Sequence, residues 1–338
     1  MKKNVHAGRR AVLGYGAAAA VAIGTGGLAV GPSFAQNTYP ARPIRLIVGF
    51  AAGGQSDILG RKLAARLTPV LGQQIVVENR VGATATLATS HVAHADPDGY
   101  TLLLGGASAS VMAPLIMPGI TYDPIKDFSS IAMLTSAMMS ISVHPSVPVE
   151  TLPQLVQLIK ANPGKYSYAS SGVGGSDHLA GELFKLEAGL PGLEHVPYKG
   201  AAPAIQDAIA GHIPVLCTTL SSILPHVQSG RLKALAVTGP QRSPMLPDLP
   251  TAVESGYPGV VAETFNFLTA PAHTPQAIID RLSQAVSEAM SDSEFIADLQ
   301  KASFATVSDS NPEKTNRFLA EEIAKWRRVV EAANLRPK

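Results

Sequence analysis

Short runs of aliphatic residues alternate with helical patterns along most of this 338-residue chain. Ile44–Phe50, Gln74–Asn79 and Thr101–Gly106 are typical of buried strands, whereas Asp57–Leu71 and Ala85–Ala95 show the 3.6-residue period of helices. Strands and helices that alternate with short connections form right-handed parallel units, in which helices cover the faces of a mostly parallel sheet. This alternation therefore restricts the chain to the α/β class.

The same alternation restarts after Val143, which predicts a second α/β domain. Its expected strands are 165–171, 193–200, 213–219 and 232–238, and its expected helices are 152–161 with Thr151 as N-cap, 176–188, 201–212 and 221–230. Further helices are expected at 275–290, up to 302, and at 312–334, resting on the first domain. Two apolar stretches, 128–145 and 260–272, would carry the chain from the first domain to the second and back. We predict domain 1 at 36–140 plus 265–338, domain 2 inserted at 141–264, and a hinge and ligand cleft between them.

The first 35 residues have the composition of an export signal. Four Lys and Arg residues within the first ten positions precede a run rich in Ala and Gly, and the small residues Ser33 and Ala35 suit cleavage before Gln36. A membrane anchor is disfavoured because the run holds few Leu, Ile or Phe residues. The adjacent Arg9 and Arg10 favour twin-arginine export. We therefore expect a periplasmic protein whose signal is removed.

The apparent basicity of the chain belongs to that signal. The whole sequence has 27 Lys and Arg against 25 Asp and Glu, and removing the four basic residues of the signal leaves 23 against 25, a net charge of −2. No basic field remains to attract nucleic acid, so nucleic acid is not an expected partner. Cys217 is the only cysteine and lies in an apolar run, so no intrachain disulfide forms and the thiol is expected to be buried and inert.

The junction Gly49–Asp57, "GFAAGGQSD", joins a strand to a helix through two glycines. No Lys follows Gly54, so it is not a P-loop, and no G-x-G-x-x-G spacing is present. Ile58 stands where a G-x-S-x-G serine elbow needs glycine. What remains is a helix N-terminus with unpaired N–H groups, approachable glycines, and Ser56 or Asp57 as the cap, which can hold a carboxylate.

A second junction of the same kind, "YASSGVGGSDHLAGEL", occupies residues 168–183. A single junction is more simply explained as an ordinary glycine turn without a ligand. Two of them, one in each predicted domain, favour function, because ligands of open α/β sheets bind outside the carboxyl ends of the strands. We predict that both helix N-termini face one cleft.

The chain resembles a known family in the segments "YPARPIRLIVGFAAGGQSD", "YASSGVGGSDHLAGELFK" and "HVPYKGAAPAIQDAIAGHI", and in the order of the segments between and after them. The family is that of the periplasmic substrate-binding proteins of tripartite tricarboxylate transporters, the Bug-type receptors. The resemblance covers nearly all of the mature chain. It implies a type II periplasmic-binding-protein-like fold, whose two domains close on a small mono- or dicarboxylate. It also implies delivery to a two-component membrane permease, a monomer, no cofactor, no metal and no enzymatic activity.

The resemblance places the ligand contacts on strand-to-helix loops of both domains. The implied residues are Ala51, Ala52, Gly53, Gly54, Gln55, Ser56, Asp57, Thr84, Ala85, Ser108, Ser170, Ser171, Gly174, Gly175, Ser176, His178 and Phe265. The chain departs from the family pattern at Ala51-Ala52, where prolines are usual, and at Thr84, where glycine is usual. It also lacks an acidic residue near Thr218, which argues against a ligand that carries an ammonium group.

Two other functions stay open at this point. An α/β hydrolase acting in the interdomain cleft would use Ser171 or Ser176 with His178 as the base. However, Ser176, Asp177 and His178 are neighbours, and a catalytic triad is assembled from separated positions. A ligand sensor for signalling has no sequence feature that separates it from a transport receptor. His91 and His94 lack a third metal ligand at a matching spacing, and aromatic residues make up only 5%, which disfavours a sugar-stacking site.

Overall fold

The computed structural model describes residues 39–302 and 304–335. The predicted export signal, with its cleavage position and its arginine pair, lies outside the described residues. In the described part of the chain, no helix combines the length and the hydropathy that a membrane span requires.

The first group of strands is parallel. Strand β1 (Ile44–Val48) lies between β2 (Ile75–Asn79) and β3 (Thr101–Gly106), and helices α1 (Gln55–Leu71) and α2 (Thr86–Ala93) follow β1 and β2. These five elements confirm the predicted ones to within three residues at each end. In β1, for example, four of the five residues are buried, as a strand covered on both faces requires.

The second group repeats this arrangement. Strand β5 (Ser167–Ser170) lies parallel to β6 (Glu194–Pro197) and to β7 (Val215–Thr219). The other elements are α4 (Leu152–Ala161), α5 (Ser176–Ala188), α6 (Ala201–Ile209), α7 (Leu220–Gln228) and β8 (Lys233–Val237). Thr151 is the N-cap of α4, as predicted. It accepts from the backbone N–H of Gln154, whose side chain accepts from the backbone N–H of Thr151, a reciprocal capping box.

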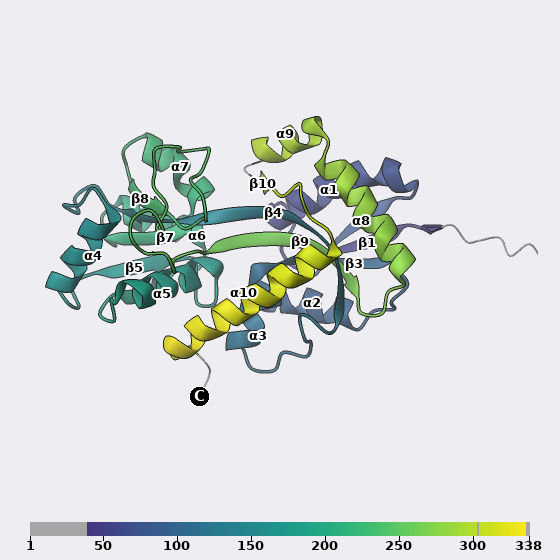
Figure 1. Cartoon of the computed structure of the whole chain (residues 1–338), viewed down its shortest axis with the longest axis horizontal. Coiled ribbons are helices and arrows are strands. Elements are labelled where there is room, and N and C mark those ends of the chain that lie inside the picture. The colour runs from purple at the N-terminus through teal and green to yellow at the C-terminus, as the bar shows by residue number, and fades with distance from the viewer. Residues whose placement is uncertain (1–38, 303, 336–338) are drawn as a thin grey trace, which may run out of the picture. The chain divides into compact units, whose positions relative to one another are not determined.

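Two antiparallel strands connect the groups (Figure 1). The first part of β4 (Phe128–Val143), through Met138, pairs with β9 (Glu263–Pro271), and its last part, from Met139, pairs with β7 and β8. Because β9 also pairs with β3, the main strand order is β2-β1-β3-β9-β4-β7-β5-β6, with β8 and the short β10 (Ala305–Thr306) on β4. The described residues form one compact unit, so the division into two domains that move remains a prediction.

The core of the first group forms between α1, the sheet and α8 (Gln276–Met290). Leu59, Leu63 and Leu67 recur every four residues on the buried face of α1 and pack with β1 and with Leu282 of α8. Each such side chain contributes roughly 1.5–3 kcal/mol when it is fully buried. Helix α9 (Ser293–Lys301) closes the same cluster with Leu299.

The last helix, α10 (Pro312–Ala332), corrects one expectation. Asn311 caps it, and the buried Trp326 donates its indole N–H to Glu322. The sequence predicts that the C-terminal helices rest on the first domain alone. This is wrong for α10, which contacts α5 of the second group as well as β4 (Figure 1). The sequence also gave no indication of the π turn at Ser108–Met112 or of the short α3 (Ala113–Ile116) that follows it.

Candidate functional site

The turns before α1 and α5 share a closing hydrogen bond and a left-handed third residue. In Ala51–Gly54 the Gly54 N–H donates to the Ala51 carbonyl at 3.1 Å, and in Gly172–Gly175 the Gly175 N–H donates to the Gly172 carbonyl at 3.3 Å. The third residue of each turn has φ +81°. That value matches the third position of a type II turn and favours glycine. Each turn leads into a helix whose first N–H groups have no partner within the helix.

Asp57 supports the first turn from inside. It accepts from the side chain of Arg61, from the backbone N–H of Gly53 and from the Asn79 amide, each at 2.9 Å. The Arg61 bond, with those from Gly53 and Asn79, lowers the pKa of Asp57 to about 2. The prediction that Ser56 or Asp57 caps α1 is wrong, because the N-cap is Gly54 and no side chain bonds there. Asp57 is only 2% exposed, so its carboxylate holds the turn in shape.

Asp177 supports the second turn in the same way, through hydrogen bonds to its carboxylate. Its carboxylate accepts from the backbone N–H of Ser171 at 2.6 Å and from the Ser171 hydroxyl at 2.8 Å. Burial raises the pKa of Asp177 against the lowering effect of these bonds. The neighbouring Ser170 is fully buried, with its hydroxyl 2.7 Å from Nε2 of His195. The hydroxyls of Ser170 and Ser171, predicted as ligand contacts, are therefore engaged inside the second group.

A cavity of about 180 Å³ lies at the carboxyl ends of β1 and β3. Five predicted residues line it, namely Gln55, Ser56, Ala85, Ser108 and Phe265. The other residues that line it are Gly49, Phe50, Thr89, Leu103, Leu104, Gly105, Gly106, Ala107, Ala109, Thr264 and Asn266. Thr264 and Asn266 alternate with Phe265 and Phe267 in the sequence, which could have indicated a polar face of β9, but the prediction named only Phe265.

The chemistry of this cavity is polar without being charged. Gln55 and Ser56 belong to the first turn of α1, Ala85 and Thr89 to the start of α2, and Ser108 opens the π turn. Helix N-termini carry partial positive charge from the aligned peptide dipoles. None of the residues that line the cavity is Asp, Glu, Lys, Arg or His. The arrangement offers hydrogen-bond donors and a positive potential to a small anion, and no carboxylate to a cation.

The backbone before α2 is left-handed at three consecutive residues. Ala83, Thr84 and Ala85 have φ values of 45°, 54° and 70°, which are unusual for residues with a Cβ. Ala85 packs so closely on Gly49 that a Cβ at Gly49 would lie 2.2 Å from the Ala85 Cβ. Thr84 is exposed and is not among the residues that line the cavity, although the resemblance implied a ligand contact there.

The remaining predicted residues belong to the two turns and to the start of α5. Ala51, Ala52, Gly53 and Gly54 form the first turn, and Gly174 and Gly175 belong to the second. Ser176 reaches the cavity wall from the second group, because its hydroxyl donates to that of Thr264 at 3.4 Å. His178 is buried beneath the second turn, where its Nδ1 accepts from the Gly174 N–H at 3.1 Å. Ser176, Asp177 and His178 thus have three different sets of partners, which is not the geometry of a triad.

Comparison with known proteins identifies the family. A family model described as the tripartite tricarboxylate transporter family receptor matches residues 59–335. The chain belongs to this family. The receptor is similar to Protein BugT of Bordetella pertussis, at 37% identity over 309 residues that cover 91% of this chain and 94% of BugT. The resemblance to Bug-type receptors is confirmed.

Solved structures of similar proteins confirm the fold class of the receptor. One is Rpa4515 of Rhodopseudomonas palustris with adipate, at 32% identity and a TM-score of 0.75, over 89% of this chain and all of that one. Another is MatC from the same organism with bound malate, at 31% identity and a TM-score of 0.72, over 86% of this chain and all of that one. Both share the α/β architecture described above.

Proposed function

We propose that this receptor captures a small mono- or dicarboxylate in the periplasm and delivers it to a two-component membrane permease, without catalysing a reaction. The observation that carries the proposal is the meeting of two helix N-termini, α1 and α2, at a cavity that has hydroxyl and amide groups and no charged side chain. The relatives with adipate and with malate support a carboxylate as the ligand.

The physical basis is the combination of backbone donors and partial charge. A helix N-terminus carries the equivalent of roughly half a positive charge, and a hydrogen bond to a charged group contributes about 1.5–3 kcal/mol. Phe50 and Phe265 give the same cavity apolar surface for the carbon skeleton of a ligand. The cavity volume of about 180 Å³ lies below the range of roughly 300–1,000 Å³ that is usual for drug-sized ligands, so the ligand has few heavy atoms.

The hydrogen-bond partners of the candidate serines argue against the hydrolase. His178, the expected base, uses Nδ1 to accept from Gly174 and is only 2% exposed. The Ser176 hydroxyl donates to Thr264, and that of Ser171 donates to Asp177. A serine nucleophile needs an available base within hydrogen-bond reach of its hydroxyl. In the described residues the Ser176 hydroxyl has no such base, and the Asp177 carboxylate that accepts from Ser171 is buried and also accepts from the Ser171 N–H.

Thermal shift and titration calorimetry of the purified protein test this function. The panel contains malate, adipate, the matching diamides and several amino acids. We expect saturable 1:1 binding of a carboxylate, with no binding of the amides. Ser56→Ala and Ser108→Ala should each weaken binding by about three- to tenfold, the value of a hydrogen bond, while Ser287→Ala on the exposed face of α8 should not. Product formation that disappears in Ser176→Ala would overturn the proposal.

Uptake and closure are separate tests. A strain that lacks the receptor should lose uptake of the bound carboxylate, whereas loss of a transcriptional response with normal uptake would indicate a sensor.

We further propose that the predicted domains, 36–140 plus 265–338 and 141–264, close on the ligand as a monomer. Small-angle scattering should then show a smaller radius of gyration when the ligand is added, at unchanged mass.

A further inference from the structure

Three stacked rings lie beneath the second turn, two of them buried and the middle one, His195, half-buried. The ring of Tyr168 in β5 stacks on His195 in β6 at a centroid distance of 4.9 Å, and His195 stacks on His178 in α5 at 4.0 Å. Tyr168 and His178 are 1% and 2% exposed. None of the three lines the candidate ligand cavity. Direct contact with a ligand therefore does not explain why these three rings are stacked.

The stack is bonded to the second turn at one end. The N–H of Gly174, the third residue of that turn, donates to Nδ1 of His178 at 3.1 Å. His195 lies 2.7 Å from the hydroxyl of Ser170, whose backbone leads into the same turn. The rings therefore hold the turn at two points.

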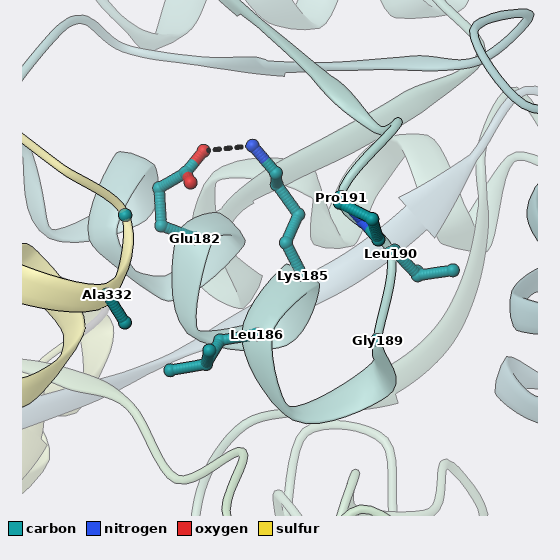
Figure 2. A pocket seen from close by; sticks show the side chains of 8 residues that line it. Glu182, Lys185, Leu186, Gly189, Leu190, Pro191 and Ala332 are labelled. Carbon is teal, nitrogen blue, oxygen red and sulfur yellow. Dashed lines mark hydrogen bonds and ion pairs between the residues drawn. The ribbon is translucent and has the colours of Figure 1, made fainter.

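At the other end the stack is bonded to Glu182 of α5. The hydroxyl of Tyr168 donates to Oε1 of Glu182 at 2.7 Å and lies 3.1 Å from the His178 carbonyl. Oε1 of Glu182 also accepts from Lys185 at 2.9 Å (Figure 2). Glu182 and Lys185 line a second cavity of about 380 Å³ beside the end of α10 (Figure 2). The polar chain thus runs from this cavity through the rings to Gly174.

The position of Gly174 matters for the candidate site. A Cβ at Gly174 would lie 2.5 Å from Cδ1 of Ile116, so the turn rests directly on α3, which follows the segment that contains Ser108. Two residues later, Ser176 donates to Thr264 in the cavity wall. A displacement of Gly174 would therefore move Ser176 and its hydrogen bond to Thr264.

The bond from Gly174 requires an unprotonated Nδ1, because a protonated ring nitrogen cannot accept. The ionisable groups around the ring are Asp177, Glu182 and Lys185 on α5, Tyr168 on β5, and His195 on β6, with Cys217 on β7 behind Tyr168. Burial, then the charge of Lys185, lowers the pKa of His178 from 6.5 to about 4. Burial and the neighbouring His178 lower the pKa of His195 to about 4 as well. Both rings are therefore neutral at neutral pH.

We propose that neutral His178 is a positioning residue for ligand binding, which fixes the second turn through the Gly174 N–H and is itself held by the His195, Tyr168 and Glu182 chain. Its effect on ligand binding rests on the proposed function. Its effect on the turn does not. Protonation of His178 removes the acceptor, so the turn is released as the pH falls toward 4.

Long-range ¹H–¹⁵N NMR and amide hydrogen exchange test the positioning role without a ligand. In the unmodified protein we expect His178 to carry its proton on Nε2 and the Gly174 amide to be protected. His178→Leu should accelerate exchange of that amide at least about tenfold, whereas His178→Asn, which places an amide oxygen close to the position of Nδ1, should preserve its protection. The Gly53 amide, which donates to Asp57, is the internal control. Between pH 7 and pH 4, protection of Gly174 relative to Gly53 should fall in the unmodified protein and stay constant in His178→Asn.

Two results would overturn the inference: a His178 ring with its proton on Nδ1 at pH 7, or equal Gly174 exchange in the unmodified protein and His178→Leu. The tautomer measurement needs no substitution, so it tests the positioning role of His178 even if His178→Leu fails to fold. In titrations with malate and adipate, His178→Leu should weaken binding by about three- to tenfold and His178→Asn should restore it. If neither acid binds the unmodified protein, the proposed ligand class fails, while the exchange data still decide the positioning role.

Discussion

Gly53 and Gly174 have the same φ, +81°, and each is the third residue of the turn that precedes a helix, α1 or α5. Their surroundings differ. A Cβ at Gly53 would meet nothing within 4 Å, whereas one at Gly174 would lie 2.5 Å from Cδ1 of Ile116. The same substitution at the two sites therefore separates backbone strain from a steric clash.

Gly53→Ala should destabilise the protein by about 1–2 kcal/mol, the cost of left-handed backbone for a residue with a Cβ. Gly174→Ala should cost about 1–3 kcal/mol more, as is usual for overpacking. The free energies of unfolding in urea measure both. Adding Ile116→Ala should recover most of the difference only in the Gly174 variant. Equal costs for the two alanines would mean that the contact with Ile116 yields without strain.

The second prediction concerns Asp57. The lowered pKa of about 2 means that its folded-state stabilisation is complete above its usual value of 3.8 and is lost as the pH falls toward 2. Asp57→Asn should destabilise the protein by about 1.5–3 kcal/mol at pH 7, the value of hydrogen bonds to a charged group. The free energy of unfolding of this variant should also change less between pH 4 and pH 2 than that of the unmodified protein. Asp98→Asn breaks a more exposed ion pair with Arg42 and should cost less than about 1 kcal/mol. Similar losses in both variants would contradict the turn-supporting role of Asp57.

The left-handed run before α2 gives a third prediction, in which the change from alanine to glycine has opposite effects on stability at two positions. Ala83 is exposed at φ 45°, and Ala65 is exposed within α1. Ala83→Gly should stabilise the protein by up to about 1 kcal/mol because it relieves strain, whereas Ala65→Gly should destabilise it by about 1 kcal/mol. Thermal unfolding of both variants checks the signs. A loss of stability in Ala83→Gly would show that the unfolded chain gains more from the glycine than the folded chain does.

Cys217 provides a fourth prediction. It is 2% exposed in β7, as its apolar surroundings in the sequence indicated, and burial raises the pKa of its thiol. Because the thiolate is the reactive form, the native protein should not react with a disulfide reagent, and one thiol should react after unfolding in guanidinium. Rapid reaction under native conditions would indicate that the β4–β7 region opens readily.

Local signals account for the elements that the sequence predicted well. The bounds of β3 and α5 agree residue for residue with the prediction, because an apolar run and a helical period are properties of neighbouring residues. Thr151 was found for the same reason, since a capping box lies within four positions.

Partners that are distant in sequence account for what was missed. A Ser or Asp at the start of a helix suggests a cap, but the sequence does not show that Asp57 turns back to Gly53 and across to Asn79, 22 positions away. Likewise Phe50, Thr89, Thr264 and Asn266 come from separate segments that meet only in the folded chain. The family resemblance implied His178 as a ligand contact, but its ring is buried and accepts from Gly174.

The change of partner along β4 limits how the gene can be divided. Ser136–Met138 face β9, and Met139–Val143 face β7 and β8, within one uninterrupted strand. A polypeptide cut between these segments would leave each half of β4 with its own partners but would divide the apolar cluster that both groups share, in which Met133 and Phe265 pack with Leu179 and Trp326. The exposed apolar surface would invite aggregation. The two strand groups must therefore be synthesised as one continuous product, and neither is suited to separate expression as an independent binding module.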